Sequence, residues 1–338
     1  MKKMLTVLIV LLPLTACDWI WSPIGYKYNE GDLPGQPVNL SDFNTEYDDY
    51  NSTAPSLGRL IPFCFSTNRN SQGGQFDVIY EPMNVHFDKN SGELTVTNEY
   101  ANWSSRLDDY KVIKNALTRI RSNSNELGPN LVVDHTRDGY GFTLLYATDS
   151  SGNFDICFTS NLDHPGFSEA EPVGFLNSAH NDLYPALNPE RDRIYFCSDR
   201  ENGDFDIYYA DLPDPEDGLD HILSGSLSHS VQKDTVLSGS GEDKCPFILG
   251  DVLVFASDRE GGLGGFDLYY SIREDGRWSI PFNFGPGINT AADEYRPILI
   301  DEQVTEDEIM MVFSSDRQGG KGGFDLWFAG ISPEPQHI

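Results

Sequence analysis

The chain has 338 residues, of which 39% are hydrophobic and 12% aromatic, and its formal net charge at pH 7 is −30. This composition can build one large all-β domain or two smaller domains with ample cores. Nucleic acid and anionic lipid surfaces would repel such a charge, so both are excluded as direct partners. The charge is compatible with simple solubility, with a cationic partner or with bound cations. Abundant glycine, proline, tyrosine and phenylalanine favour many short strands joined by tight turns.

The first sixteen residues have the features of a secretory signal. Lys2 and Lys3 precede an apolar run that ends in small residues before Cys17. The run is too short to be a membrane-spanning helix. Its ending, "LTAC", resembles the bacterial lipobox, which implies cleavage before Cys17 and attachment of lipid to that residue. We therefore expect a signal peptide over 1–16, a lipidated tether over 17–35 and a single domain over 36–338.

Four further cysteines follow in the domain, namely Cys64, Cys157, Cys197 and Cys245. Their spacings match no metal site, and three of them lie in apolar, strand-like contexts. Buried free thiols are the favoured state. Export would also permit disulfides, so the sequence leaves their pairing open.

A Phe-Asp pair recurs five times and marks a repeated unit. A strand that ends in a polar triplet such as "SDR" precedes each pair, and further upstream a proline opens another apolar run. In four of the five units an acidic residue stands three positions before that proline. The Phe-Asp aspartates are Asp77, Asp155, Asp206, Asp267 and Asp325; the arginines of the triplets are Arg69, Arg200, Arg259 and Arg317; the acids before proline are Glu126, Asp182, Asp243 and Glu294. The second unit carries Ser150 in place of the arginine.

The spacing of these units predicts a β-propeller. Each unit accommodates four antiparallel strands, and such a sheet buries both faces only by packing radially against its neighbours. Five blades are expected, with six as the alternative. The last unit stops after its third strand, whereas residues 36–50 resemble 280–295, with Asn39 matching Asn283 and Asn44–Thr45 matching Asn289–Thr290. The N-terminal strand should therefore complete the last blade and close the ring.

The full pattern, "SDR-x-GG-x-GG-FDLYY" followed by "G-x-W-x-x-P-x-N-x-G-x-x-INT-x-x-DE-x-x-P", is similar to the WD40-like, TolB-type β-propeller family. It resembles above all the propeller segment of peptidoglycan-associated, OmpA-family outer-membrane lipoproteins. The resemblance implies a lipid-anchored protein of the outer membrane. Its implied function is a protein-interaction scaffold in a secretion, assembly or cell-wall-linked complex, with envelope proteins as partners.

The repeated residues and the irregular segments should lie on opposite faces. The acids, arginines and Phe-Asp turns fall in connections on one rim, where they serve the architecture or hold a ligand. No cofactor or metal is expected, with Ca²⁺ on these carboxylates as the alternative. Insertions near 81–125 and 211–235 emerge on the other face, where irregular loops favour a partner surface. The candidate residues there are Trp103, Asp214, Asp217 and His221.

Catalysis is not expected from these residues. Glycoside cleavage needs two carboxyl groups in different environments, whereas the acids here occupy equivalent repeated positions. The histidines show no metal-ligand spacing. The alternatives to a scaffold are a non-catalytic glycan-binding surface lipoprotein and, as the lesser one, a propeller glycoside hydrolase or lyase.

Overall fold

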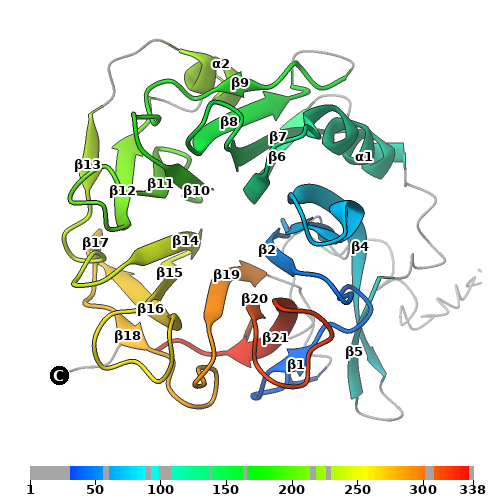
Figure 1. Ribbon diagram of the computed structural model, residues 1–338, viewed down its shortest axis with the longest axis vertical. Helices are drawn as coiled ribbons and strands as arrows, with labels where there is room; N and C mark the ends of the chain where they lie inside the picture. Colours follow the sequence, from blue (N-terminus) through cyan, green and yellow to red (C-terminus); the bar gives the residue numbers. More distant parts are fainter. Residues whose placement is uncertain are drawn as a thin grey trace, which may run out of the picture.

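The computed structural model describes residues 31–55, 61–88, 93–98, 108–136, 139–162, 166–213, 218–225, 230–300 and 308–334. In these ranges, five antiparallel sheets stand around a common axis and form a five-bladed β-propeller (Figure 1). The prediction of an all-β propeller with five blades is confirmed, and the six-bladed alternative is wrong. No helix in the described part of the chain is long and apolar enough to cross a membrane.

Each blade runs from an inner strand at the axis to an outer strand at the periphery. Blade 1 consists of β2 (Asp49–Thr53), β3 (Ile61–Thr67), β4 (Asp77–Asp88) and β5 (Glu93–Thr97). Blade 2 consists of β6 (Glu126–Thr136), β7 (Gly139–Thr148), β8 (Asp155–Ser160) and β9 (Glu171–Pro172). Blade 3 consists of β10 (Asp182–Leu187), β11 (Arg193–Ser198), β12 (Asp206–Asp211) and β13 (Val231–Lys233).

The last two blades differ at their outer edge. In blade 4, β14 (Asp243–Leu249), β15 (Val252–Ser257) and β16 (Asp267–Glu274) are followed by β17 (Arg277–Trp278) and β18 (Phe282–Asn283), which both pair with β16. Blade 5 contains β19 (Glu294–Ile300), β20 (Ile309–Ser315), β21 (Asp325–Ile331) and, from the other end of the chain, β1 (Val38–Asn39).

The pairing of β1 with β21 closes the ring. Val38 lies opposite Phe328 and Asn39 opposite Trp327. The Leu40 amide donates to the carbonyl of Leu326 at 2.9 Å, and the Asn39 amide group donates to Asp325 at 2.9 Å. The predicted closure by the N-terminal strand is confirmed.

Every inner strand contains a bulge after its second residue. The register shifts there in all five inner strands, and one residue in each has a positive φ: Asn51, Gly128, Tyr184, Cys245 and Arg296. The next residue is a proline in blades 2 to 5, and proline is tolerated at a bulge because it cannot donate to the ladder. The repeated proline of the sequence thus marks where each inner strand bends.

One buried arginine crosses the central axis at the level of the bulges. Arg296, fully buried, donates to the carbonyls of Pro129 at 3.0 Å and Pro246 at 3.4 Å, and its guanidinium lies 5.4 Å from the centre of the Tyr184 ring. Burial lowers the pKa of Arg296. One side chain therefore connects inner strands of four blades across the axis.

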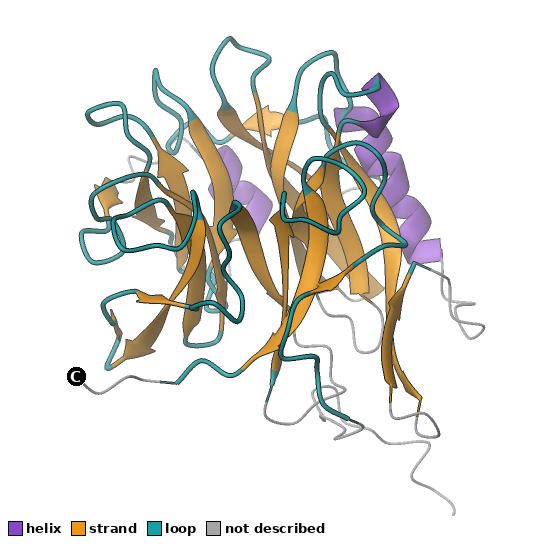
Figure 2. Ribbon diagram, turned by 60° about the horizontal axis from the view of Figure 1, so that its bottom comes forward, coloured by secondary structure: helices purple, strands orange, loops and turns teal. Residues whose placement is uncertain are grey.

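Hydrophobic cores lie between neighbouring blades. Phe196 and Tyr208 of blade 3, for example, pack with Leu145 and Phe158 of blade 2. The helices α1 (Asp108–Ile120) and α2 (Leu219–Ser224) add buried residues to two of these cores from the outside of the ring (Figures 1 and 2). A short 3₁₀ turn, η1 (Arg69–Ser71), follows β3. The sequence segment 81–125 contributes the outer strand β5 and α1, and the segment 211–235 contributes α2 and β13.

Candidate functional site

The acid and the arginine of each repeat form an ion pair inside their blade. In blade 3, Arg200 Nη2 lies 2.6 Å from Asp182 Oδ1 and 2.6 Å from the carbonyl of Leu176, and Nε donates to Ser198 Oγ at 3.0 Å. Asp182 is fully buried. The other Asp182 oxygen, Oδ2, accepts from the amide and the hydroxyl of Ser178. Every oxygen of this carboxylate is therefore satisfied.

The same arrangement recurs in blades 1, 4 and 5. The corresponding pairs are Arg69–Asp49 at 2.7 Å, Arg259–Asp243 at 2.5 Å and Arg317–Glu294 at 2.9 Å. Burial raises the pKa of Asp243 and Glu294, and the arginine counteracts it. The sequence pattern does not single out Asp49, because Ser52 stands where the other repeats have the proline three positions after the acid. The match of Asn44–Thr45 with Asn289–Thr290 contained the signal, since an acid follows both threonines at the fourth position.

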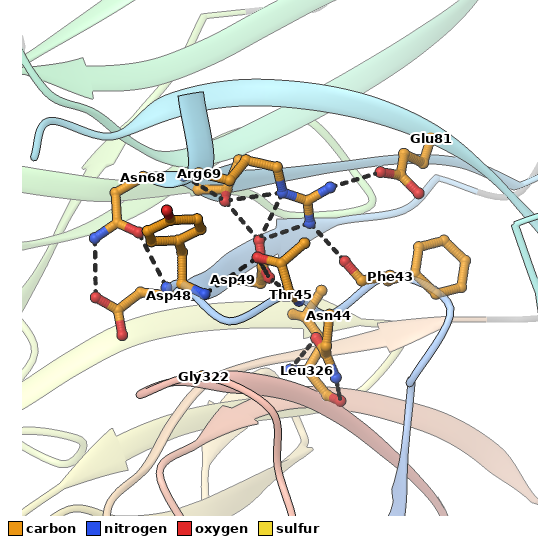
Figure 3. A network of polar contacts seen from close by, with 12 residues as sticks. Phe43, Asn44, Thr45, Asp48, Asp49, Asn68, Arg69, Glu81, Gly322 and Leu326 are labelled. Atoms are coloured by element: carbon orange, nitrogen blue, oxygen red, sulfur yellow. Dashed lines mark hydrogen bonds and ion pairs between the residues drawn. The ribbon is translucent and has the colours of Figure 1, made fainter. Parts of the chain in front are cut away.

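Figure 3 shows this pair at the junction of blades 1 and 5. Asp49 accepts from Arg69, Thr45 and Thr67, and Arg69 also bonds Glu81 and the carbonyl of Phe43. The Phe-Asp turns link the blades to one another. In each, the phenylalanine carbonyl accepts from the amide of the next blade's acid, as in Phe154–Asp182 at 2.8 Å and Phe324–Asp49 at 2.8 Å.

The aspartates of the Phe-Asp pairs mostly bind their own turns. Asp267 accepts from the amides of Leu263 and Gly264, and Asp325 accepts from those of Lys321 and Gly322. Asp155 accepts from Ser151 at 2.5 Å, and Asp206 pairs with Lys233 at 2.5 Å. Asp77 accepts from Asn70 at 2.9 Å and lies 3.3 Å from Arg121. The repeated rim residues are thus engaged with one another, blade by blade.

Blade 2 breaks this symmetry. Glu126 has Ser150 where the other blades have arginine, and burial raises its pKa to about 7, helped by the nearby Asp77. The hydroxyl of Ser122 donates to Glu126 Oε1 at 2.5 Å, while Oε2 is buried without a hydrogen-bond partner among the described residues.

A recess between blades 3 and 4 gathers side chains that lie outside the acid–arginine pairs and the Phe-Asp turns. Its volume is about 600 Å³, and its walls come from the turn between β10 and β11, the end of β12, the segment after β13 and the β16–β17 hairpin. The lining residues that matter for ligand chemistry are Asp192, Arg193, Tyr195, Tyr209, Asp211, Asp234, Arg273, Arg277 and Trp278. Several of these turns emerge on the face opposite to the repeated rim motifs.

The aromatic side chains of this recess form one connected platform. Trp278 Nε1 donates to the hydroxyl of Tyr195 at 2.9 Å, and the two rings stand edge to face with their centres 6.3 Å apart. The Tyr195 ring lies 5.8 Å from that of Tyr209, and Arg193 covers Tyr209 at 4.2 Å. Burial raises the pKa of Tyr195, so its hydroxyl stays protonated at neutral pH.

Charged groups surround the platform in pairs. Arg193 lies 2.6 Å from Asp211, and Arg273 bonds Glu190 at 2.5 Å and Asp251 at 3.1 Å. The hydrogen bonds from Arg273 lower the pKa of Glu190. Arg277 is exposed at the mouth of the recess. Tyr195 itself is buried, and Arg193 and Arg273 lie over the Tyr209 and Trp278 rings at 4.2 and 5.8 Å from their centres. The recess therefore combines half-buried aromatic rings with carboxylates and guanidinium groups that already hold fixed positions.

The residues predicted for a partner face are largely outside the described part of the chain. This applies to Trp103, Asp214 and Asp217, and also to the lipidation residue Cys17. His221 lies exposed on α2, beside a shallow pocket shared with Glu171 and Ser168. The described residues include no group of three or more His, Cys, Asp or Glu side chains placed to hold a metal ion. Cys64, Cys157, Cys197 and Cys245 are free thiols.

Comparison with known proteins yields no matching family model and no similar curated protein. Similar solved structures include an α-L-arabinofuranosidase from Podospora anserina in complex with cellotriose, 14% identical with a TM-score of 0.48, over 90% of this chain and 99% of that one. An arabinanase from Bacillus subtilis is 10% identical with a TM-score of 0.45, over 86% and 96% of the two chains. A GH62 hydrolase in complex with xylotriose is 11% identical with a TM-score of 0.46, over 90% and 99%. At sequence identities this low, the likeness is one of fold alone. The activities in these names belong to the other proteins.

These comparisons correct three expectations from the sequence. The similar structures named here are glycoside hydrolases, so the resemblance to TolB-type, peptidoglycan-associated lipoproteins is wrong. The scaffold function derived from it and the expected absence of enzymatic activity fall with it. The physical reason lies in the rim contacts: the repeated acids, arginines and Phe-Asp turns hold blades together, so they report a propeller and carry no information about activity.

Proposed function

We propose that this protein recognises a carbohydrate in the recess between blades 3 and 4. The observation that carries the proposal is the platform of Trp278, Tyr195 and Tyr209 flanked by Arg193 and Arg273. A sugar ring presents apolar C–H faces and a periphery of hydroxyl groups. Aromatic faces pack against the former, while carboxylates and guanidinium groups exchange hydrogen bonds with the latter. A volume of about 600 Å³ lies within the range of ligand sites.

Binding to a glycan array, followed by calorimetry on each hit, tests this proposal. Replacement of Trp278 by alanine should abolish the hits, whereas replacement of Tyr140, an exposed tyrosine on β7, should leave them unchanged. Wild-type protein that binds no glycan, or a Trp278→Ala variant that binds as well as wild type, would contradict it.

Glycoside hydrolysis is a second candidate for the same recess. The favouring observation is that Asp192, Asp211 and Asp234 line it beside the aromatic platform. Cleavage of a glycosidic bond requires a pair of carboxyl groups, one of them protonated. If the recess is catalytic, release of reducing ends from a bound glycan should fall at least about 100-fold in Asp192→Asn or Asp234→Asn. Wild-type protein that binds a glycan without cleaving it leaves recognition as the function.

We also propose that the protein is exported and anchored by lipid at Cys17 in the outer membrane. The sequence of residues 1–17 supports export and the lipid anchor, and the outer membrane is the location that the fractionation below tests. Metabolic labelling with a clickable fatty acid should mark the wild type and not a Cys17→Ser variant, and density-gradient separation of envelopes should place the labelled protein with the outer membrane. An unlabelled wild type contradicts the anchor.

A further inference from the structure

Blade 2 retains the positions that surround the arginine in other blades but has lost the arginine itself. The guanidinium of Arg200 in blade 3 has three acceptors: Asp182 Oδ1, the Leu176 carbonyl and Ser198 Oγ. Blades 4 and 5 repeat this set of acceptors around Arg259 and Arg317. In blade 2 the same register positions are held by Glu126, Ile120 and Thr148, and Ser150 replaces the arginine.

Because blade 2 has no arginine at this position, one oxygen of Glu126 has no hydrogen-bond partner among the described residues. Ser122 bonds Glu126 Oε1 with its amide and hydroxyl, as Ser178 bonds Asp182 Oδ2. Glu126 Oε2 therefore corresponds to the oxygen that Arg200 binds in blade 3. This oxygen is buried and lacks a hydrogen-bond partner among the described residues, and Glu126 as a whole is 1% exposed.

A second buried carboxylate oxygen without a hydrogen-bond partner in the described part of the chain lies where blade 1 meets blade 2. Asp77, 3% exposed, belongs to the Phe-Asp turn whose Phe76 carbonyl accepts from the Glu126 amide at 2.8 Å. Its Oδ1 has no hydrogen-bond partner, and it is the single such oxygen among the five Phe-Asp aspartates, all of which the structure describes. Arg121, the cation beside this pair, reaches the other oxygen, Asp77 Oδ2, at 3.3 Å and is 48% exposed. Buried carboxylate oxygens are costly unless a cation or hydrogen bonds compensate them.

We propose that blade 2 binds a hard metal cation, Ca²⁺ in the first place, between Glu126 Oε2 and Asp77 Oδ1, where the other blades have a guanidinium. Carboxylate, carbonyl and hydroxyl oxygens are the ligands that Ca²⁺ takes. Ile120 is the last residue of α1, and the final carbonyls of a helix lack intrahelical partners and carry partial negative charge. With two carboxylates, the site needs such neutral oxygens and water to complete the coordination. The ion would join blades 1 and 2.

The site is tested by comparing thermal unfolding in CaCl₂ with thermal unfolding in EDTA, for the wild type and for Ser150→Arg, which restores the arginine of the other blades. Ca²⁺ should raise the Tm of the wild type by several degrees, because a ligand bound to the native state alone stabilises it. Ser150→Arg should raise the Tm in EDTA and eliminate the response to Ca²⁺, since its guanidinium would occupy the site. Ser240→Arg, which adds the same charge at an exposed rim position of blade 4, should keep the full response.

Calcium calorimetry on Glu126→Gln and Asp77→Asn provides a readout that does not depend on Ser150→Arg folding. Both should lose the heat of binding seen with the wild type, and Asp155→Asn, the same motif position in blade 2 with Ser151 as its partner, should retain it. A wild type without binding heat and without a Tm shift overturns the proposal. A Ca²⁺ response that persists in Glu126→Gln and Asp77→Asn overturns it as well.

Discussion

The rim of repeated motifs and the recess between blades 3 and 4 are built on opposite principles. At the rim, the acids of blades 1, 3, 4 and 5 each pair with the arginine of their own repeat, and these contacts recur with nearly constant distances. In the recess, Tyr195 of blade 3 meets Trp278 of blade 4, a contact that occurs once among the described residues, and neither side chain is part of the acid–arginine pairs or the Phe-Asp turns. Residues that recur serve the ring, and residues that occur once are free to select a ligand. The comparison predicts that rim substitutions affect stability and recess substitutions affect binding.

The largest expected effect is at the rim. Replacing Arg200 with alanine leaves the fully buried Asp182 without its cation, and loss of one partner of a buried pair costs about 3–5 kcal/mol. Urea unfolding should show this loss. Arg277→Ala, which removes an exposed arginine from the recess, should leave the free energy of unfolding within about 0.5 kcal/mol of wild type. Equal losses in the two variants would remove the distinction between the regions.

A smaller loss of stability is expected at the closing blade. Asn44, 4% exposed, accepts from the Leu326 amide at 2.8 Å and donates to its carbonyl at 2.9 Å. Asn44→Ala should cost about 1–3 kcal/mol, because the buried Leu326 amide loses its partner and the Leu326 carbonyl keeps only the Leu40 amide. Asn289→Ala, which removes the equivalent bonds to Leu268 in blade 4, is the matched comparison. Similar costs in both variants would show that closure uses the ordinary contact of a blade.

In the recess, Trp278→Ala should weaken glycan binding at least about 10-fold, equivalent to about 1.4 kcal/mol, because it removes one face of the platform. Calorimetry measures the affinity and urea unfolding the stability of the same sample. A variant that loses stability as severely as Arg200→Ala would assign Trp278 to the architecture instead.

The smallest effect concerns the thiols. Burial raises the pKa of Cys157 to about 11 and that of Cys245 to about 12. At pH 8 only about one Cys157 side chain in 1,000 is then a thiolate, which is the reactive form. Native protein should react with iodoacetamide far more slowly than urea-unfolded protein, and mass spectrometry should find all four domain cysteines alkylated after unfolding. Fast labelling of native Cys245 would contradict its burial.

The repeats made the fold predictable, including the closure by β1, since Asn39 and Asn44 repeat the positions of Asn283 and Asn289. The recess was not predictable, because Tyr195 and Trp278 are brought together only by the packing of blade 3 on blade 4, across 83 residues of sequence. Asp49 was accessible in principle but hidden by the serine at its proline position. The family resemblance was misleading for a physical reason. The side chains of the motif contact one another, so the motif indicates how the blades are built and gives no information about the ligand.

The strand that closes the ring has a consequence for synthesis. Asn39 and Asp325 are 286 residues apart, so β1 leaves the ribosome long before its neighbour β21 exists. Blades 1 to 4 consist of contiguous segments and can form in order as they emerge, whereas blade 5 must wait for β21. Until β21 is available, the folding chain is an open arc with an unpaired strand at one end, and this interval is when a chaperone would have most to protect.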